Sequence, residues 1–282
     1  MTKAEKFIDI RESIRSKNPN LLKILPKFIL NYIRKTIHEE GLNDILSRYA
    51  NYGGLKFVDK MVHEEFRINT MVSGFDQVEE NKRYIFVANH PWGGMEAACL
   101  LDIVGQKYQE PRFIVNDLLM SIKNYHPLFI PVNKHGAQGR ENAKLMEENF
   151  SSDKPILIFP AGLVSRKTNG KVEDLEWKHN FISKAIQHKR DIVPVYIDGK
   201  NSNFFYRVAN ARKALGIKAN IEMFYLVNEM MKNHDVDLPF YFGKPIPYQT
   251  FDNTKKKQIW AKQVKEHTYR LKDDFQRSFL DK

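Results

Sequence analysis

The sequence predicts an α/β fold with a mostly parallel central sheet flanked by helices, preceded by an N-terminal helical region. Between residues 84 and 226, apolar strand-forming runs alternate with longer stretches of helical periodicity, which is typical of parallel strands joined by helices. Residues 1–65 lack strand-forming runs. The chain has 282 residues, 42% of them hydrophobic, so a sizeable core can form.

The N-terminal region contains a candidate membrane-docking helix between Leu21 and Ile37, started or kinked by Pro26. Its aliphatic and aromatic residues are interleaved with four basic ones: Lys23, Lys27, Arg34 and Lys35. This pattern is typical of a helix in a membrane interface, and packing against the core with solvated lysines explains it about equally well. A second amphipathic segment, 42–62, follows and is interrupted by Gly53-Gly54.

We expect three regions along the chain: a membrane-facing helical region (1–65), an α/β domain (66–250) and a C-terminal amphipathic helix (251–282). Expected strands cover 66–72, 84–88, 112–115, 155–159, 192–197 and 221–226, and expected helices cover 95–108, 140–150, 175–188 and 203–215. The segment 240–246 is predicted to be a late edge strand that ends in prolines.

Composition limits the possible functions. A net charge of +11 suits nucleic acid, an anionic membrane surface or an acidic carrier or substrate. A nucleic-acid-binding module is disfavoured, because the basic residues are spread along the chain without an aromatic-and-basic strand signature. Cys99 is the only cysteine, which fits a reducing compartment, and its apolar neighbours favour a core residue over a nucleophile. We expect no secretory signal and no membrane-spanning helix.

No metal site is expected either. His38-Glu39-Glu40 and His63-Glu64-Glu65 are interpreted as solvated helix faces, because neither histidine has an evident second ligand at helical spacing.

The candidate catalytic stretch runs from Asn89 to Glu96, between a predicted buried strand and a predicted helix. Such corners of α/β folds commonly bind ligands. His90 offers an imidazole suited to proton transfer near neutral pH. Glu96 follows a bend at Gly93-Gly94, which could fold its carboxylate back onto the ring and so orient a base that activates a hydroxyl. Taken alone, these residues also fit a structural role, in which His90 only bonds to the backbone and Glu96 is an ordinary acidic residue in the first turn of a helix.

Two later loops carry further candidate binding residues. Arg140 opens a predicted helix after a glycine-containing loop, 131–140, and its guanidinium suits phosphate or carboxylate. The second loop, which follows the most apolar strand, holds Gly162, Ser165 and Arg166 and could bind a head group or line an acyl entry. Structural turns with a solvated arginine are the alternative in both cases.

The order of these segments is informative: a strand and Asn89-His90, a Gly-x-x-x-Arg loop, a strand and Phe159-Pro160-x-Gly162, then Val193-Pro194-Val195. It resembles the glycerolipid acyltransferase family of the lysophosphatidic-acid acyltransferase type, over roughly residues 83–246. The resemblance implies an α/β acyltransferase without metal or other cofactor, peripheral on the cytoplasmic face of the inner membrane. Acyl carrier protein or coenzyme A would supply the acyl thioester as cosubstrate.

The resemblance also implies residue roles. His90 and Glu96 would be catalytic; Asn89, Gly93, Gly94, Arg140, Gly162, Ser165 and Arg166 would bind substrate. The N–H groups near Gly93 and Gly94 are candidate donors to the oxyanion, and Arg140 would hold an anionic head group or the donor's phosphate.

Two departures from the family pattern favour a particular branch. The usual acid position, 95, is Met, and the acid stands one residue later at Glu96. The usual Phe-Pro-Glu-Gly-x-Arg is replaced by 159–164, without its glutamate and first arginine. The pattern resembles the branch that O-acylates lyso-aminolipids such as lyso-ornithine or lyso-glycine lipids. Acylation of a 1-acyl-glycerol-3-phosphate is the alternative, and a non-catalytic membrane-surface protein is a third hypothesis.

Overall fold

The computed structural model describes residues 6–132, 137–217 and 220–280. Seven strands form one sheet in the order β1-β9-β8-β2-β5-β3-β4. All pairings in it are parallel except β8 with β9, so the mostly parallel sheet predicted from the sequence is confirmed. The strands are β1 (Asn69–Ser73), β2 (Tyr84–Ala88), β3 (Arg112–Asn116), β4 (Phe129–Val132), β5 (Ile156–Ile158), β8 (Asp191–Ile197) and β9 (Asp237–Phe242).

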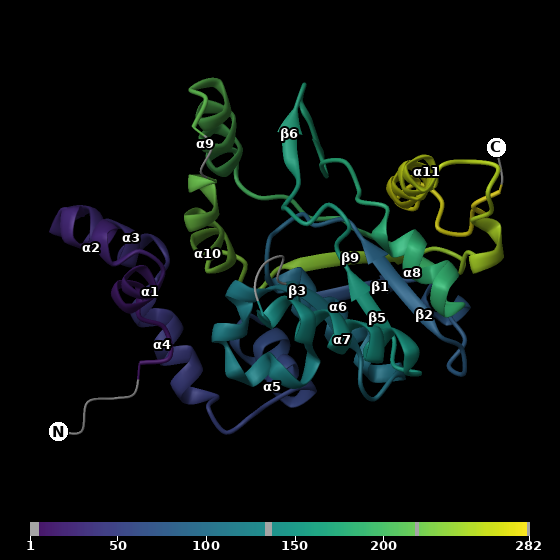
Figure 1. Ribbon diagram of the computed structural model, residues 1–282, viewed down its shortest axis with the longest axis horizontal. Coiled ribbons are helices and arrows are strands. Elements are labelled where there is room, and N and C mark those ends of the chain that lie inside the picture. The colour runs from purple at the N-terminus through teal and green to yellow at the C-terminus, as the bar shows by residue number, and fades with distance from the viewer. Residues whose placement is uncertain (1–5, 133–136, 218–219, 281–282) are drawn as a thin grey trace.

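Helices and one small hairpin complete the fold (Figure 1). The helices are α1 (Ile10–Lys17), α2 (Pro19–Ile24), α3 (Lys27–Thr36), α4 (Glu39–Arg48), α5 (Leu55–Asp59), the π-helix η1 (Lys60–Glu65), α6 (Met95–Lys107), α7 (Ala137–Ser151), α8 (Asn180–His188), α9 (Asn203–Ala214), α10 (Phe224–Met230) and α11 (Lys257–Arg270). Strands β6 (Arg166–Thr168) and β7 (Lys171–Glu173) pair antiparallel in a separate hairpin.

The core lies on both faces of the sheet, and β2 illustrates why. Successive side chains of a strand point to opposite faces. Tyr84 and Phe86 therefore belong to the cluster under α5, η1 and α6, whereas Ile85 and Val87 belong to the cluster under α8 and α11. All five residues of β2 are buried, as a central parallel strand requires.

Three sequence predictions need correction. Residues 221–226 are helical, not a strand, because Glu222, Leu226 and Glu229 are buried at helical spacing. The late strand β9 is not an edge strand, since it lies between β1 and β8. Helix α8 begins at Asn180 rather than 175; ahead of it, Trp177 is buried in the core.

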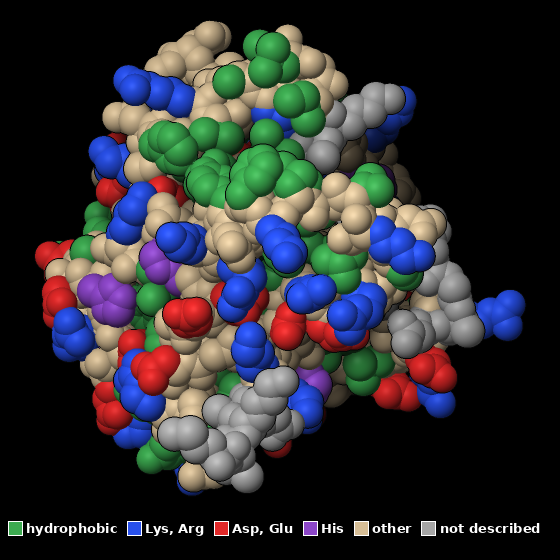
Figure 2. Space-filling model, turned by 90° about the vertical axis from the view of Figure 1, so that its left-hand side faces the viewer, with side chains coloured by type: hydrophobic (Ala, Val, Ile, Leu, Met, Phe, Trp, Pro, Cys, Tyr) green, Lys and Arg blue, Asp and Glu red, His purple; other side chains and the backbone are tan. Residues whose placement is uncertain are grey.

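The N-terminal helices lie beside the sheet, next to α10 (Figure 1). Pro26 separates α2 from α3, as expected. No residue of α3 is buried, and Ile24 and Phe28 are 77% and 72% exposed. Figure 2 faces this side and shows apolar side chains gathered over its upper part, with Lys and Arg below them. Helix α3 contacts α10 and α4 but leaves an apolar face open, so docking of that face on a membrane stays a prediction.

Residues of α4, α5 and η1, in contrast to α3, contribute to the same core cluster as the sheet. The proposed division into three regions stays a prediction. Among the described helices, none is both long enough and apolar enough to cross a membrane.

Candidate active site

His90 is the second residue after the central strand β2 and lies where the parallel strands β2, β5 and β8 all end. Its Nδ1 lies 2.9 Å from Oε1 of Glu96, the second residue of α6. The imidazole stacks on Phe159, which follows β5, with ring centroids 4.1 Å apart. The His90 side chain is 17% exposed, so the ring is held by protein on most sides and still reachable.

Glu96 is fully buried and accepts four hydrogen bonds. Its Oε1 accepts from His90 Nδ1 and from the N–H groups of Trp92 and Gly93, and its Oε2 accepts from the N–H of Gly94 at 2.7 Å. Burial raises the pKa of Glu96, but the nearby imidazole and the backbone N–H groups outweigh it, so the pKa lies below its ordinary value. The carboxylate is therefore ionised at neutral pH.

The ionised carboxylate fixes the tautomer of His90. A carboxylate without a proton only accepts hydrogen bonds, so Nδ1 of the ring must carry the hydrogen. In the neutral imidazole, Nε2 is then the basic nitrogen. Within the described part of the chain, Nε2 has no hydrogen-bond partner, which leaves it available to take a proton from a substrate hydroxyl.

The turn between β2 and α6 requires glycine at position 93. Gly93 has φ +100°, and a Cβ there would lie 2.8 Å from Val164 and 2.9 Å from Leu226. The N–H groups of Gly93 and Gly94 are occupied by Glu96. The expectation that they face the oxyanion is therefore corrected: they hold the carboxylate of Glu96.

Asn89 and Ser165 are buried and serve the loop rather than a substrate, contrary to expectation. Asn89 bonds the N–H and the carbonyl of Ile197 with its amide, at 2.7 and 2.9 Å, and so joins the ends of β2 and β8. The Ser165 hydroxyl donates to Asp174 at 2.6 Å, and the Ser165 N–H donates to the carbonyl of His90.

The two arginines do not reach His90 through any contact among the described residues. Arg166 forms an ion pair with the fully buried Glu222 at 2.8 Å and donates to the carbonyl of Val164, so its guanidinium is already engaged. Arg140 lies exposed in the first turn of α7, and part of the loop before it, 133–136, is outside the described residues. Gly162 is exposed in the turn after β5, with φ +66°.

Sequence reasoning missed Asp174 and Asn201, which also hold the loop. Asp174 accepts from the His90 N–H at 3.1 Å and from the Trp177 indole at 2.8 Å, and burial raises its pKa. Asn201 donates to the carbonyls of Pro91 and Trp92. Neither residue belongs to a recognisable sequence pattern; only the three-dimensional contacts reveal them.

A buried strand end with an oriented histidine and an ionised partner has the geometry that could take a proton from a hydroxyl. A sequence model of the acyltransferase family matches residues 12–278, so the chain belongs to that family and is an acyltransferase. The family resemblance predicted from the motif order is confirmed.

The chain is similar to two curated proteins over nearly its whole length. It is 43% identical over 266 residues to a lyso-glycine lipid O-acyltransferase of Bacteroides thetaiotaomicron, covering 94% of this chain and 97% of the relative. It is 42% identical to the protein of that name from Phocaeicola vulgatus, covering 94% and 95%. Among solved structures, it is similar to the 1-acyl-sn-glycerophosphate (LPA) acyltransferase PlsC from Thermotoga maritima, with a TM-score of 0.49, 16% identity and coverage of 93% and 99%.

Proposed function

We propose that this acyltransferase moves a fatty acyl group from an acyl thioester to the hydroxyl of a lyso-lipid, specifically a lyso-glycine lipid. Acyl carrier protein or coenzyme A would carry the donor. The observation that carries the proposal is the open Nε2 of His90, opposite an Nδ1 held by Glu96 at 2.9 Å. The names of the two curated relatives support the lyso-glycine acceptor.

In this mechanism, Nε2 of His90 takes the hydroxyl proton as the acceptor oxygen attacks the thioester carbonyl. The imidazolium that forms is stabilised by the Glu96 carboxylate. When the carbon–sulfur bond breaks, the imidazolium returns the proton to the leaving thiolate, and the ester remains on the acceptor. General-base help of this kind contributes about 10²–10⁴-fold.

The acceptor's carboxylate is proposed to bind in a cavity of about 250 Å³ between the β6–β7 hairpin and the start of α9. Lys167 and Lys200 line this cavity together with Asn201, whose bonds to Pro91 and Trp92 place it against the catalytic loop. Two lysines and a helix N-terminus favour an anion. In this role they replace Arg166, whose guanidinium is engaged by Glu222.

The apolar and basic face around α2 and α3 supports the proposal that the enzyme docks on an anionic membrane. The proposed location is peripheral, on the cytoplasmic face of the inner membrane. The exposed side chains Ile24, Phe28 and Tyr32 would enter the interface. The hydroxyl of Tyr32 bonds that of Tyr225 on α10, at 2.6 Å, which ties the docking helices to the α/β domain.

The test is a vesicle assay with the purified full chain, an acyl thioester and either lyso-glycine lipid or lysophosphatidic acid, with the acylated product measured by mass spectrometry. We expect acylation of lyso-glycine lipid, loss of about 10²–10⁴-fold in His90→Ala, and normal activity in the control His179→Ala. Lys200→Ala should raise KM for the acceptor. Full activity in a folded His90→Ala protein refutes the mechanism, and a preference for lysophosphatidic acid refutes the acceptor.

A further inference from the structure

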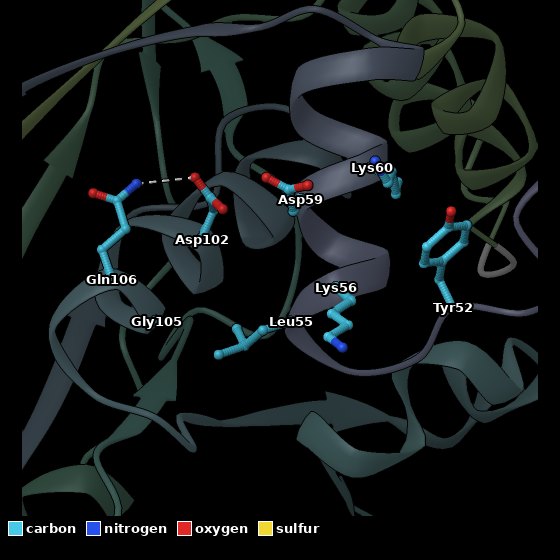
Figure 3. A pocket seen from close by; sticks show the side chains of 8 residues that line it. All are labelled: Tyr52, Leu55, Lys56, Asp59, Lys60, Asp102, Gly105 and Gln106. Atoms are coloured by element: carbon cyan, nitrogen blue, oxygen red, sulfur yellow. Dashed lines mark hydrogen bonds between the residues drawn. The ribbon is translucent and has the colours of Figure 1, made fainter.

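A second group of chemically active side chains lies between the α5–η1 helix and α6, apart from the acyl-transfer machinery. A cavity of about 320 Å³ opens there, and Asp59 and Asp102 are among its lining residues. Figure 3 shows their two carboxylates in the gap between the helices. With His63 they form a set in which one ligand atom from each residue lies within 4.8 Å of the others.

Helical geometry brings these three residues together. Asp59 ends α5 and His63 lies four residues later in the π-helix η1, so both side chains project from one face of a continuous helix. Asp102 comes from α6, which packs against this helix. Contrary to the expectation from sequence, His63 does have a carboxylate at helical spacing, on its N-terminal side. Local π-helical turns are frequent at functional sites.

Among the described residues, neither carboxylate forms an ion pair with a lysine or arginine. Asp102, whose side chain is 10% exposed, accepts from His63 Nε2 at 2.9 Å and from Gln106 at 3.3 Å, both on Oδ2. Asp59 makes no hydrogen bond or ion pair with any residue that the structure describes. When His63 is neutral, the set carries two negative charges in a small volume, which favours a bound cation.

The nearby lysines are not paired with these carboxylates, although the pKa of Lys60, raised mainly by its hydrogen bond to Glu64, is also raised by the charge of Asp59. Lys56 and Lys60 line the same cavity. Lys60 is paired with Glu64, on the next turn of its own helix, and lies 5.4 Å from the ring centre of Tyr52. In Figure 3 the Lys56 side chain extends away from the carboxylates.

We propose that Asp59, His63 and Asp102 bind a divalent transition-metal ion of the zinc class. One imidazole nitrogen and two carboxylate oxygens suit Zn²⁺ or Mn²⁺ better than Mg²⁺ or Ca²⁺, which prefer oxygen ligands alone. Tetrahedral bonds of about 2.0–2.2 Å put the ligand atoms about 3.4 Å apart, and water completes the fourth position. The three ligand atoms now lie within 4.8 Å of one another, so the side chains must close in on the ion. The ion takes the place of the hydrogen between His63 Nε2 and Asp102, and the neutral ring keeps its one hydrogen on Nδ1.

Such an ion would act as a tie between two helices. It would fasten the α5–η1 helix to α6, the helix whose first turn carries Glu96. Because folding preorganises ligands from separate elements, metal binding stabilises the folded state by mass action. The chain would therefore become more stable in zinc without zinc taking part in acyl transfer.

Equilibrium dialysis of the tag-free full chain against Zn²⁺, with metal counted by mass spectrometry, tests the site directly. We expect one Zn²⁺ per chain at micromolar concentration, a higher Tm with Zn²⁺ and no comparable effect of Mg²⁺. Asp59→Asn and His63→Ala should each weaken Zn²⁺ binding at least tenfold. Both side chains are exposed, so the metal-free Tm of Asp59→Asn should match that of the unsubstituted chain.

The matched control is Glu147→Gln. Glu147 pairs with His188 at the same 2.9 Å but has no second carboxylate in a comparable set among the described residues. This variant should bind Zn²⁺ normally. Failure of the unsubstituted chain to bind Zn²⁺ overturns the proposal, as does unchanged affinity in Asp59→Asn. Affinity that falls as much in Glu147→Gln also overturns it, because surface histidines would then explain the binding.

Discussion

Replacing Glu96 by glutamine removes the negative charge beside His90 while keeping the size of the side chain. Glu96 Oε1 accepts three hydrogen bonds and Oε2 accepts one, from the N–H of Gly94. A glutamine has a single acceptor oxygen, which retains most bonds at the Oε1 position. Its NH₂ group then meets the Gly94 N–H, donor against donor. The His90 tautomer is therefore kept, but the charge and one bond are lost.

The magnitude follows from these losses. Hydrogen bonds to charged groups contribute about 1.5–3 kcal/mol, against about 1 kcal/mol for neutral ones. The imidazolium that forms during the reaction loses this charged partner in Glu96→Gln, so we expect kcat to fall about 10–100-fold, equivalent to about 1.4–2.7 kcal/mol. The unpaired N–H of Gly94 should lower the free energy of unfolding by about 1–3 kcal/mol.

The assay is the vesicle reaction at saturating donor and acceptor, together with urea unfolding. KM should be nearly unchanged, because Glu96 is fully buried and acts through His90. Glu96→Ala should lower kcat further, because nothing then orients the ring of His90. The loss should approach the about 10²–10⁴-fold expected when the general base itself is missing. A folded Glu96→Gln enzyme with kcat within twofold of the unsubstituted chain would refute the role of the charged pair.

Three further predictions concern stability and membrane binding. Asn89→Ala leaves the backbone groups of Ile197 without their buried partners and should lower the free energy of unfolding by about 1–3 kcal/mol. An unchanged midpoint of urea unfolding would contradict a stabilising role of Asn89. The pKa of Glu96 is lowered in the folded state, so its carboxylate stabilises the fold above its ordinary value of 4.5, and this contribution is lost as the pH falls through the lower folded pKa. The stability difference between the unsubstituted chain and Glu96→Gln should therefore shrink below about pH 4.5, and a constant difference speaks against this linkage. Phe28→Asp should reduce flotation with anionic vesicles about tenfold or more, whereas Leu280→Asp, at a similarly exposed site, should not. Equal effects of the two substitutions would contradict specific docking through α3.

The contact between His90 and Glu96 was predictable because the two residues are close in sequence. His90 and Glu96 are six residues apart on one strand–turn–helix unit, so the strand pattern before them and the helical pattern after them determine where both side chains stand. The alternation of strands and helices likewise predicted the parallel sheet, because each element carries its own periodicity.

The supporting residues were not predictable, because their partners are distant in sequence. Arg166 was expected to face a head group, but Glu222, 56 residues later, engages it. Asp174 holds the backbone of His90 from 84 residues away. A buried ion pair and a solvated arginine have the same appearance in a sequence, and only the fold decides which one forms.

The bend at Gly93-Gly94 explains how an acid one residue beyond the usual family position can still serve His90. Helix α6 begins at Met95, whose side chain is buried in the core, so position 95 is committed to packing. Glu96 folds back over the turn and accepts from the three N–H groups that precede the helix. These N–H groups favour the ionised carboxylate, as a helix N-terminus does. The interactions that start the helix are thus the ones that keep Glu96 charged and set the His90 tautomer, so a change that loosens this turn should lower stability and catalysis together.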